Sequence, residues 1–269
     1  DWRSPFLADS KAEWAGFPAL EELFDYDGSG VMPGRTWVIA PDVSSLNSRW
    51  ARLVKEKDAA KKEELFYPHI RNGKPGDKHI GKIVASPLAG GKAHGGPIKD
   101  VTSQVPERVE RYAFRSFDRQ WLIADARVLN QPNPELWNGY SANQVYFTAL
   151  QAHTPDQGPS ITISGLIPDL HHFKGNFGGR VMPLWRDASA TVSNIKSGLI
   201  NYLSTTYGKP ATAPDVMAYV AALLAHPAFT ARFKEDLIRP GLRVPVTADA
   251  TLFDRAVALG REVIWLHTY

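Results

Sequence analysis

Residues 112–123, which read Tyr-Ala-Phe-Arg-Ser-Phe-Asp-Arg-Gln-Trp-Leu-Ile, constrain the fold of this chain more than any other segment. Four aromatic side chains supply apolar mass, and Arg115, Asp118 and Arg119 add three charges to the same span. From Arg119 onward, the aromatic and β-branched content predicts a β-strand. The charges fit either an internal ion-pair network that fixes a turn or a platform that presents guanidinium groups to phosphates or guanine edges. The chemistry alone favours the internal network.

The composition indicates a folded globular protein. The chain has 269 residues, of which 43% are hydrophobic and 11% aromatic, enough for one large core or two modest ones. It has no cysteine, which excludes disulfides and thiolate metal sites and fits a reducing cytoplasm. No apolar run approaches the roughly 18 residues of a membrane span, so no membrane partner is expected. Because the chain begins with Asp1 instead of Met, we expect it to be a piece of a longer polypeptide.

The pattern of apolar and turn residues predicts an α+β fold with a strand-rich central region and a helical C-terminal lobe. The alternation in residues 161–164 predicts a strand with one buried face. Strands are expected at 36–39, 111–115, 120–124, 144–149, 160–165 and 179–185. Helices are expected at 17–24, 44–66, 195–207, 214–225, 228–238 and 250–266, with Ser44 or Ser45, Gly208, Pro214 and Asp249 marking their ends.

Residues 68–106 are rich in glycine and proline and lack periodicity, which predicts a long loop. The window 68–99 holds six Lys or Arg residues and only Asp77 as an acid, although the net charge of the whole chain is +3. A phosphate-facing patch is expected to show this asymmetry, and so is a solvated loop. Neither Gly-Lys pair in the window is followed by Ser or Thr, so no nucleotide-binding loop is predicted. The candidate phosphate ligands are Arg71, Lys74, Lys78 and His79.

Residues 169–180 contain the densest group of functional side-chain types. Two adjacent histidines on a strand point to opposite faces, which disfavours a shared metal ion. We expect one histidine to pack inward and the other to line a polar surface whose Lys, Asn and Arg side chains reach phosphates or base edges. An ordinary hairpin with polar tips is the alternative interpretation. The candidate DNA ligands of this segment are His171, His172, Lys174, Asn176 and Arg180.

Two motifs carry a resemblance to a known family. The pattern Tyr-x-Phe-Arg-x-Phe-Asp-x-x-Trp at 112–121 resembles the aromatic-Arg-Pro-Phe-Asp-x-Arg motif that opens the target recognition domain of many adenine-N6 DNA methyltransferases. Ser116 replaces the usual Pro, and the second Arg comes one position early, at Arg119. Residues 218–229 are similar to a Tyr-Ile-Tyr-Ala-Ile-Leu-His-Ser-Pro-x-Tyr helix of the same proteins. The chain thus resembles the C-terminal portion of the Type ISP restriction-modification enzymes, over 111–269 and also over 30–41 and 71–79.

The resemblance implies that the chain recognises a specific sequence in double-stranded DNA, through Arg115, Arg119 and the 71–79 and 171–180 segments. It implies S-adenosylmethionine, ATP and Mg for the parent enzyme, whose methyltransferase and motor domains would be partners in the same polypeptide. No catalytic residue, cofactor or metal is expected in this fragment. The sequence contains neither the Asn/Asp-Pro-Pro-Tyr/Phe motif that holds a flipped adenine nor a glycine-rich loop for S-adenosylmethionine.

The resemblance also implies a division of the chain. Residues 1–67 would connect to a missing methyltransferase domain, 68–110 would form the basic loop, and 111–269 would be the target recognition domain, β-rich over 111–187 and helical over 194–269. Two alternatives stay open at the level of sequence. One is a carbohydrate- or small-ligand-binding enzyme domain. The other is a module that docks on the methyltransferase domain without reading DNA.

Overall fold

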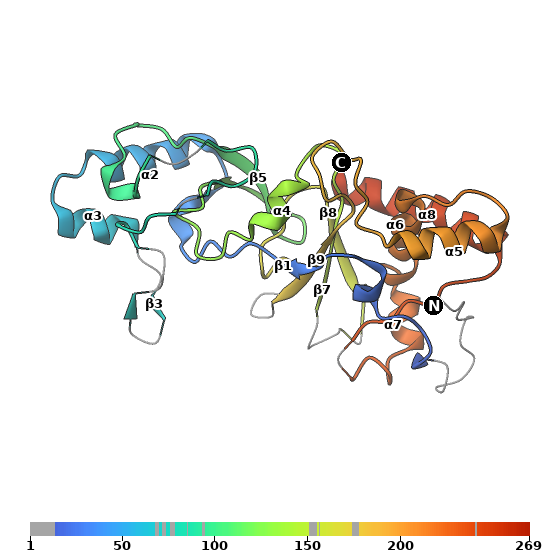
Figure 1. Cartoon of the computed structure of the whole chain (residues 1–269). Coiled ribbons are helices and arrows are strands. Elements are labelled where there is room, and N and C mark those ends of the chain that lie inside the picture. The colour runs from blue at the N-terminus through green and yellow to red at the C-terminus, as the bar shows by residue number, and fades with distance from the viewer. Residues whose placement is uncertain are drawn as a thin grey trace.

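The structure is a computed structural model that describes residues 14–67, 70–71, 74–75, 79–84, 86–92, 95–150, 155, 157–173, 178–239 and 241–269. Its fold is α+β, as predicted, with antiparallel sheets and a helical C-terminal lobe. Figure 1 shows an elongated body with a pair of helices at one end, a sheet in the middle and the C-terminal helices at the other end.

The sheets are built from strands that pair antiparallel throughout. The larger sheet has the order β1-β9-β7-β8, and the smaller one has the order β2-β6-β5. The strands of the larger sheet are β1 (Gly28–Ser29), β9 (Gly179–Pro183), β7 (Tyr146–Leu150) and β8 (Ile161–Ser164). Those of the smaller sheet are β2 (Ile39–Ala40), β6 (Asp118–Ile123) and β5 (Val109–Arg115). A separate hairpin joins β3 (Ile70–Arg71) to β4 (Lys74–Pro75).

The helices fall into an N-terminal pair, one short central helix and a C-terminal group. They are α2 (Val43–Lys55), α3 (Ala59–Phe66), α4 (Pro134–Asn138), α5 (Ser197–Tyr207), α6 (Ala213–Leu224), α7 (Pro227–Arg232) and α8 (Ala250–Thr268). Short 3-10 turns are η1 (Leu20–Leu23), η2 (Thr36–Val38) and η3 (Ile98–Asp100).

The N-terminal third differs most from the sequence prediction. The predicted strand at 36–39 is the turn η2 followed by β2, and the predicted helix at 17–24 is only the turn η1. The single helix predicted over 44–66 is two helices, because Asp58 caps a new start by accepting hydrogen bonds from the backbone N–H groups of Ala60 and Lys61. Asp42 caps α2 in place of either serine, and its carboxylate accepts from Ser45 N at 2.8 Å.

The central and C-terminal elements agree better with prediction. Five strands and four helices lie where they were expected within a few residues, although α7 ends early, at Arg232. Asp249 caps α8, and Gly208 ends α5 with a φ of 64°. Helix α4 was missed. The prediction of one buried face for residues 161–164 is wrong, since all of β8 is buried between the C-terminal helices and the turn that contains His172.

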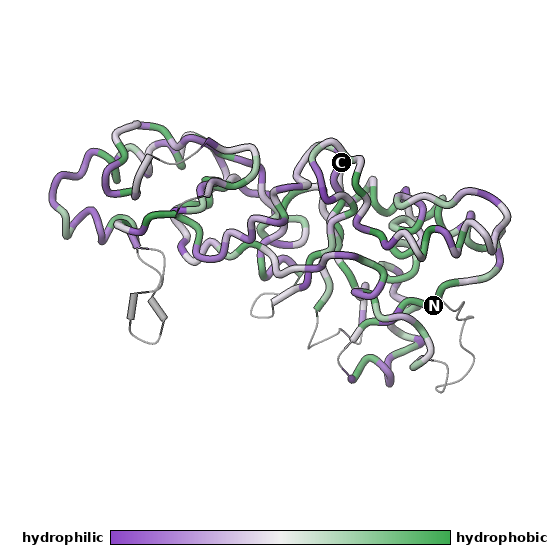
Figure 2. Tube along the Cα trace, viewed as in Figure 1, coloured by the Kyte–Doolittle hydropathy of each residue, from purple (hydrophilic) through white to green (hydrophobic). Residues whose placement is uncertain are grey.

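The larger sheet separates two hydrophobic cores. Successive side chains of a strand point to opposite faces, so Phe147 and Met182 enter the core of the C-terminal helices. Their neighbours Tyr146 and Val181 enter the core that contains α2, α3 and the smaller sheet. The hydropathy of the chain follows this arrangement in Figure 2, where apolar residues run along the strands and the outer parts of α2 and α3 are hydrophilic.

The packing of α6 on α8 depends on one glycine. A Cβ atom at Gly260 would lie 1.7 Å from the carbonyl oxygen of Ala218. The two helices therefore approach each other more closely than any larger residue would allow, and this contact sets the position of α8 on the C-terminal core.

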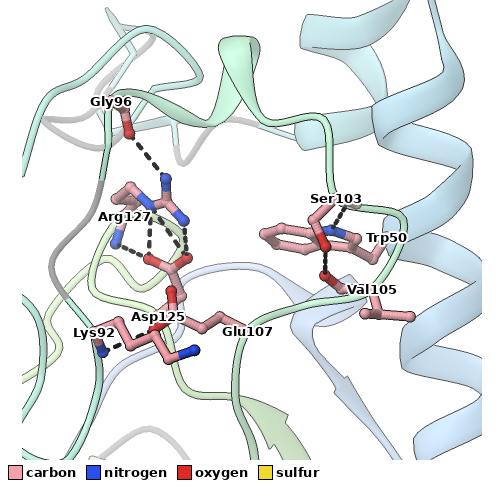
Figure 3. A network of polar contacts seen from close by, with 8 residues as sticks. All are labelled: Trp50, Lys92, Gly96, Ser103, Val105, Glu107, Asp125 and Arg127. Atoms are coloured by element: carbon pink, nitrogen blue, oxygen red, sulfur yellow. Dashed lines mark hydrogen bonds and ion pairs between the residues drawn. The ribbon is translucent and has the colours of Figure 1, made fainter.

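A buried ion pair helps to hold residues 95–107 against the body (Figure 3). Nη2 of Arg127 donates to the Asp125 carboxylate at 2.7 Å, and the two side chains are only 7% and 3% exposed. Nη1 of Arg127 donates to the carbonyl of Gly96 at 2.8 Å. The Trp50 indole donates to the carbonyl of Ser103 at 3.0 Å. The segment is therefore held to the body at Gly96 and at Ser103.

We predict that Asp125→Ala lowers the free energy of unfolding by about 3–5 kcal/mol, because it leaves the Arg127 guanidinium buried without its carboxylate. Urea denaturation followed by circular dichroism measures the loss. The matched control is Glu107→Ala, which removes an exposed carboxylate that accepts from Lys92 N and should cost about 1 kcal/mol or less. Equal losses in the two variants would contradict the structural role of the buried pair.

Candidate nucleic-acid interface

The candidate interface is organised around the buried carboxylate of Asp169. It accepts hydrogen bonds from the Tyr112 hydroxyl at 2.7 Å, from Nη1 of Arg115 at 2.9 Å and from His171 N at 2.7 Å. Burial raises the pKa of Asp169, and these three partners offset part of that rise. Burial also holds the pKa of Tyr112 well above 10, so its hydroxyl remains a donor. These bonds join β5 to the 169–172 turn.

The ion pair of Arg115 reaches outside its own segment, whereas the predicted internal network joined Arg115, Asp118 and Arg119. The partner of Arg115 is Asp169, and the Arg115 side chain remains 35% exposed. The guanidinium also lies 3.9 Å from the centre of the Phe114 ring. A role of Arg115 in DNA binding stays a prediction.

Arg119 ties the β5–β6 hairpin to the C-terminal helix. Its Nη1 donates to the carbonyl of Tyr269 at 2.6 Å and its Nη2 to that of His267 at 3.0 Å. A cation at the C-terminal end of a helix also interacts favourably with the helix dipole. At the tip of the hairpin, the Phe117 ring lies tilted against the His267 ring, with the two ring centres 5.2 Å apart, and Phe117 adopts a left-handed φ of 64°. The hairpin is therefore tied to the end of α8 as well as to Asp169.

The two adjacent histidines differ in burial, and a surface role for His171 stays a prediction. His172 is 2% exposed, and its Nδ1 lies 3.1 Å from the Thr162 hydroxyl. Its carbonyl accepts hydrogen bonds from Ser116 N at 2.8 Å and from the Ser116 hydroxyl at 3.0 Å. His171 is half-buried, and its Nδ1 has no hydrogen-bond partner among the described residues. His172 therefore supports the turn, while His171 is nearer to solvent.

Arg180, at the start of β9, is held by a carboxylate that the sequence analysis did not identify. Its Nε and Nη2 both donate to the Asp27 carboxylate, and Nη2 also donates to the Asp27 carbonyl at 2.9 Å. Asp27 is itself fixed, because Asn194 bonds the backbone of the preceding Tyr26 at 2.9 and 2.8 Å. A guanidinium clamped along one edge has a defined orientation, and the Arg180 side chain is 36% exposed. In the sequence, Asp27 stands next to Gly28, Ser29 and Gly30, a turn-rich context that carries no signal for a partner of Arg180.

The other candidate residues lie between positions 71 and 79 or in segments outside the described residues. Arg71 and Lys74 are paired positions of the β3–β4 hairpin, which stands away from the body in Figure 1. His79 is exposed. Lys78, Lys174 and Asn176 lie outside the described residues. The structure thus gathers Arg115, His171 and His172 around the Asp169 turn. Gly179 N donates to Leu170 O at 2.9 Å and so connects this turn to Arg180.

The described residues contain neither a metal-binding cluster nor a membrane-spanning helix. No three His, Asp or Glu side chains gather there in an arrangement that would hold a metal ion. None of the helices in the described ranges combines the length and apolarity needed to cross a membrane. An open hollow beside the α2–α3 elbow is lined by lysines and acids in alternation, among them Lys55, Glu56 and Lys99.

The family to which the chain belongs follows from its match to a known domain. Residues 22–269 match the Type ISP C-terminal specificity domain. The chain belongs to this family. No curated protein sequence matches the chain.

Three solved structures are similar to this specificity domain. The LlaBIII enzyme, an ATP-dependent Type ISP restriction-modification enzyme bound to DNA, matches with a TM-score of 0.63 and 14% identity over all of this chain and 17% of its own. A DrdV–DNA complex matches with a TM-score of 0.59 and 17% identity over 91% of this chain and 23% of its own. A nuclease-deletion mutant of the Type ISP enzyme LlaGI with a DNA substrate mimic has a TM-score of 0.57 and 16% identity, over 95% and 20% of the two chains.

These similarities support the fold. The identities of 14–17% are too low to transfer individual residues, and the chain spans about a fifth of the length of each similar chain.

We predict that His172 makes stability depend on pH. Burial lowers its pKa from 6.5 to about 4, so the unfolded chain binds a proton between these values before the folded chain does. Stability contributed by neutral His172 is therefore present above pH 6.5 and is lost as the pH falls towards 4, by up to about 3 kcal/mol. Urea denaturation between these pH values measures the loss.

The raised pKa of Asp169 acts in the opposite sense, because its protonation favours the folded state. The comparison with His172→Asn isolates the histidine, since this variant keeps a polar group near Thr162 and removes the titration. A stability profile of equal slope in both proteins between pH 4 and 6.5 would show that His172 is not the group responsible.

Proposed function

We propose that this specificity domain recognises the DNA target sequence of a Type ISP restriction-modification enzyme. The match of residues 22–269 to the Type ISP specificity domain carries the proposal. The solved structures that share the fold, which contain DNA or a DNA substrate mimic, support it. Nothing in the described structure favours a carbohydrate- or ligand-binding enzyme. The hollow beside α2 and α3 is lined by lysines as well as acids.

The described contacts support a division of labour between the two candidate segments. Arg180 follows the 171–179 segment directly and is clamped by Asp27. Reading a guanine edge requires a guanidinium with a fixed orientation, which this clamp supplies. Arg71 and Lys74 lie on a two-strand hairpin away from the cores, so they suit phosphate contacts, which tolerate more varied geometry. Phosphate contacts would position the duplex, and Arg180 with its neighbours would specify the sequence.

The catalytic steps belong to the remainder of the parent polypeptide in this proposal. The domain would direct adenine methylation and, on unmodified sites, ATP-dependent cleavage by domains outside this chain, with S-adenosylmethionine, ATP and Mg bound there. Arg115, Arg119 and His172 keep supporting roles in it. Their recorded contacts fix the β5–β6 hairpin and the 169–172 turn next to the proposed reading segment.

We predict different losses for base-reading and phosphate-binding side chains. Arg180→Ala should cost about 1–3 kcal/mol on the cognate duplex and little on a scrambled one. Lys74→Ala should weaken binding to both duplexes equally and lower the salt dependence by about one unit. The cognate sequence is first selected from a random duplex library with the unaltered protein, and affinities are then measured by competition at two salt concentrations.

Lys209→Ala, which removes an exposed lysine paired with Asp254 on the C-terminal lobe, is the matched control and should change neither duplex. Failure of the unaltered full-length protein to select any sequence would favour the docking module over the reading domain. Equal losses for Arg180→Ala on both duplexes would remove the base-reading role from Arg180 alone.

A further prediction concerns the clamp on Arg180. Asp27→Asn removes a negative charge and one ionic partner while keeping the size of the side chain. We expect this variant to bind scrambled DNA more tightly, because a carboxylate near the phosphates is lost, and to discriminate less between cognate and scrambled duplexes. The ratio of the two affinities is the measurement, and an unchanged ratio would show that Asp27 serves the fold of β1 only.

A further inference from the structure

Helix α8 carries an apolar stripe that none of the described residues covers. The neighbouring face of the helix, with Phe253, Val257 and Gly260, is buried in the C-terminal core. Along the stripe, Leu252, Leu259 and Leu266 are 37%, 60% and 68% exposed. Large exposed apolar residues that form a continuous line, in contrast to scattered ones, mark an interaction surface.

The spacing of the stripe is that of a helix that packs on another helix. Leu252, Ala256, Leu259, Val263 and Leu266 follow one another in steps of four and three residues, which is the seam of a coiled coil. Ala256 and Val263 are half-buried against the core of the chain itself. The three leucines lie outside that core. The seam can therefore pack against a second helix whose apolar residues follow the same alternating four- and three-residue spacing.

The charges of α8 indicate which helix would fit. Asp254 and Arg261 form ion pairs within the chain, with Lys209 and Asp215 respectively. Arg255 and Glu262 are exposed, and neither has an ion-pair partner among the described residues. Each precedes a seam position by one residue, so both flank the same side of the seam. One positive and one negative charge, seven residues apart, form a self-complementary edge.

We propose that α8 pairs antiparallel with α8 of a second copy of this chain. The register that sets Arg255 of one copy against Glu262 of the other repeats the same contact by two-fold symmetry. This register also sets Leu252 opposite Val263 of the second copy, and Leu259 opposite its Ala256. Each of these two contacts joins a large exposed side chain with a smaller half-buried one, which is the complementarity that knobs-into-holes packing requires, and Leu266 lies beyond the paired part of the seam.

Sedimentation velocity over a range of micromolar concentrations tests the pairing on the whole chain. The unaltered protein should pass from monomer to dimer as its concentration rises, and Leu259→Lys should remain monomeric. The single reversals Arg255→Glu and Glu262→Arg should each raise the dissociation constant about tenfold, because they turn both symmetric contacts repulsive. The double variant that carries both reversals should restore the affinity, since the pair is re-formed with its signs exchanged.

Ile238→Lys is the control for the loss of an exposed apolar side chain, since Ile238 is 79% exposed and lies after α7, outside the seam. It should dimerise normally, and the thermal unfolding temperature of every variant verifies that it folds. An unaltered chain that stays monomeric throughout would overturn the proposal and leave the seam to a different partner. Two other outcomes would also overturn the proposal, because they would place the contact on another face. One is a dimer that persists in Leu259→Lys, and the other is a double charge reversal that does not restore the affinity lost in the single reversals.

Discussion

The carboxylate of Asp169 is the constraint on which the arrangement of this domain depends. It is buried beside the larger sheet and accepts hydrogen bonds from Tyr112, Arg115 and His171. A buried carboxylate is costly without partners, so the strand β5 and the 169–172 turn are held together wherever Asp169 remains inside. Through Leu170, which bonds both Val31 and Gly179, the same turn reaches the N-terminal segment and β9. One acidic side chain thus links both sheets of the fold.

The arginines of the domain have different structural environments and different roles. Arg127 is fully engaged inside, and Arg119 binds the last carbonyls of α8. Arg115 and Arg180 differ, because each pairs with one carboxylate while its side chain stays 35% or 36% exposed. Arg180 is held at more points, since two of its nitrogens donate to the Asp27 carboxylate and one also donates to the Asp27 carbonyl. A reading arginine needs rigid support and an open edge, and we therefore propose Arg180 for the contact with bases.

Sequence reasoning succeeded where a local signal coincides with the local structure. The capping residues Asp249 and Gly208 marked real helix ends, and the aromatic segment 112–123 formed the predicted strand pair. It failed at residues 36–39 and 161–164, where local pattern and tertiary environment disagree. The run at 36–39 is apolar because it packs against α2 and α3, although its backbone turns. The strand at 161–164 alternates in hydropathy, yet the Thr162 side is covered by His172 and the whole strand is buried.

The α+β class, most of the C-terminal elements and the resemblance to the Type ISP specificity region could be predicted from the sequence, because strand content, helix caps and family motifs are properties of neighbouring residues. The partners of the charged side chains became known only from the folded arrangement. Arg115 meets Asp169, Arg180 meets Asp27 and Arg119 meets the end of α8, over separations of 54, 153 and about 150 residues. A guanidinium binds any carboxylate or carbonyl that comes within reach, so its choice depends on which distant segments the two hydrophobic cores bring together.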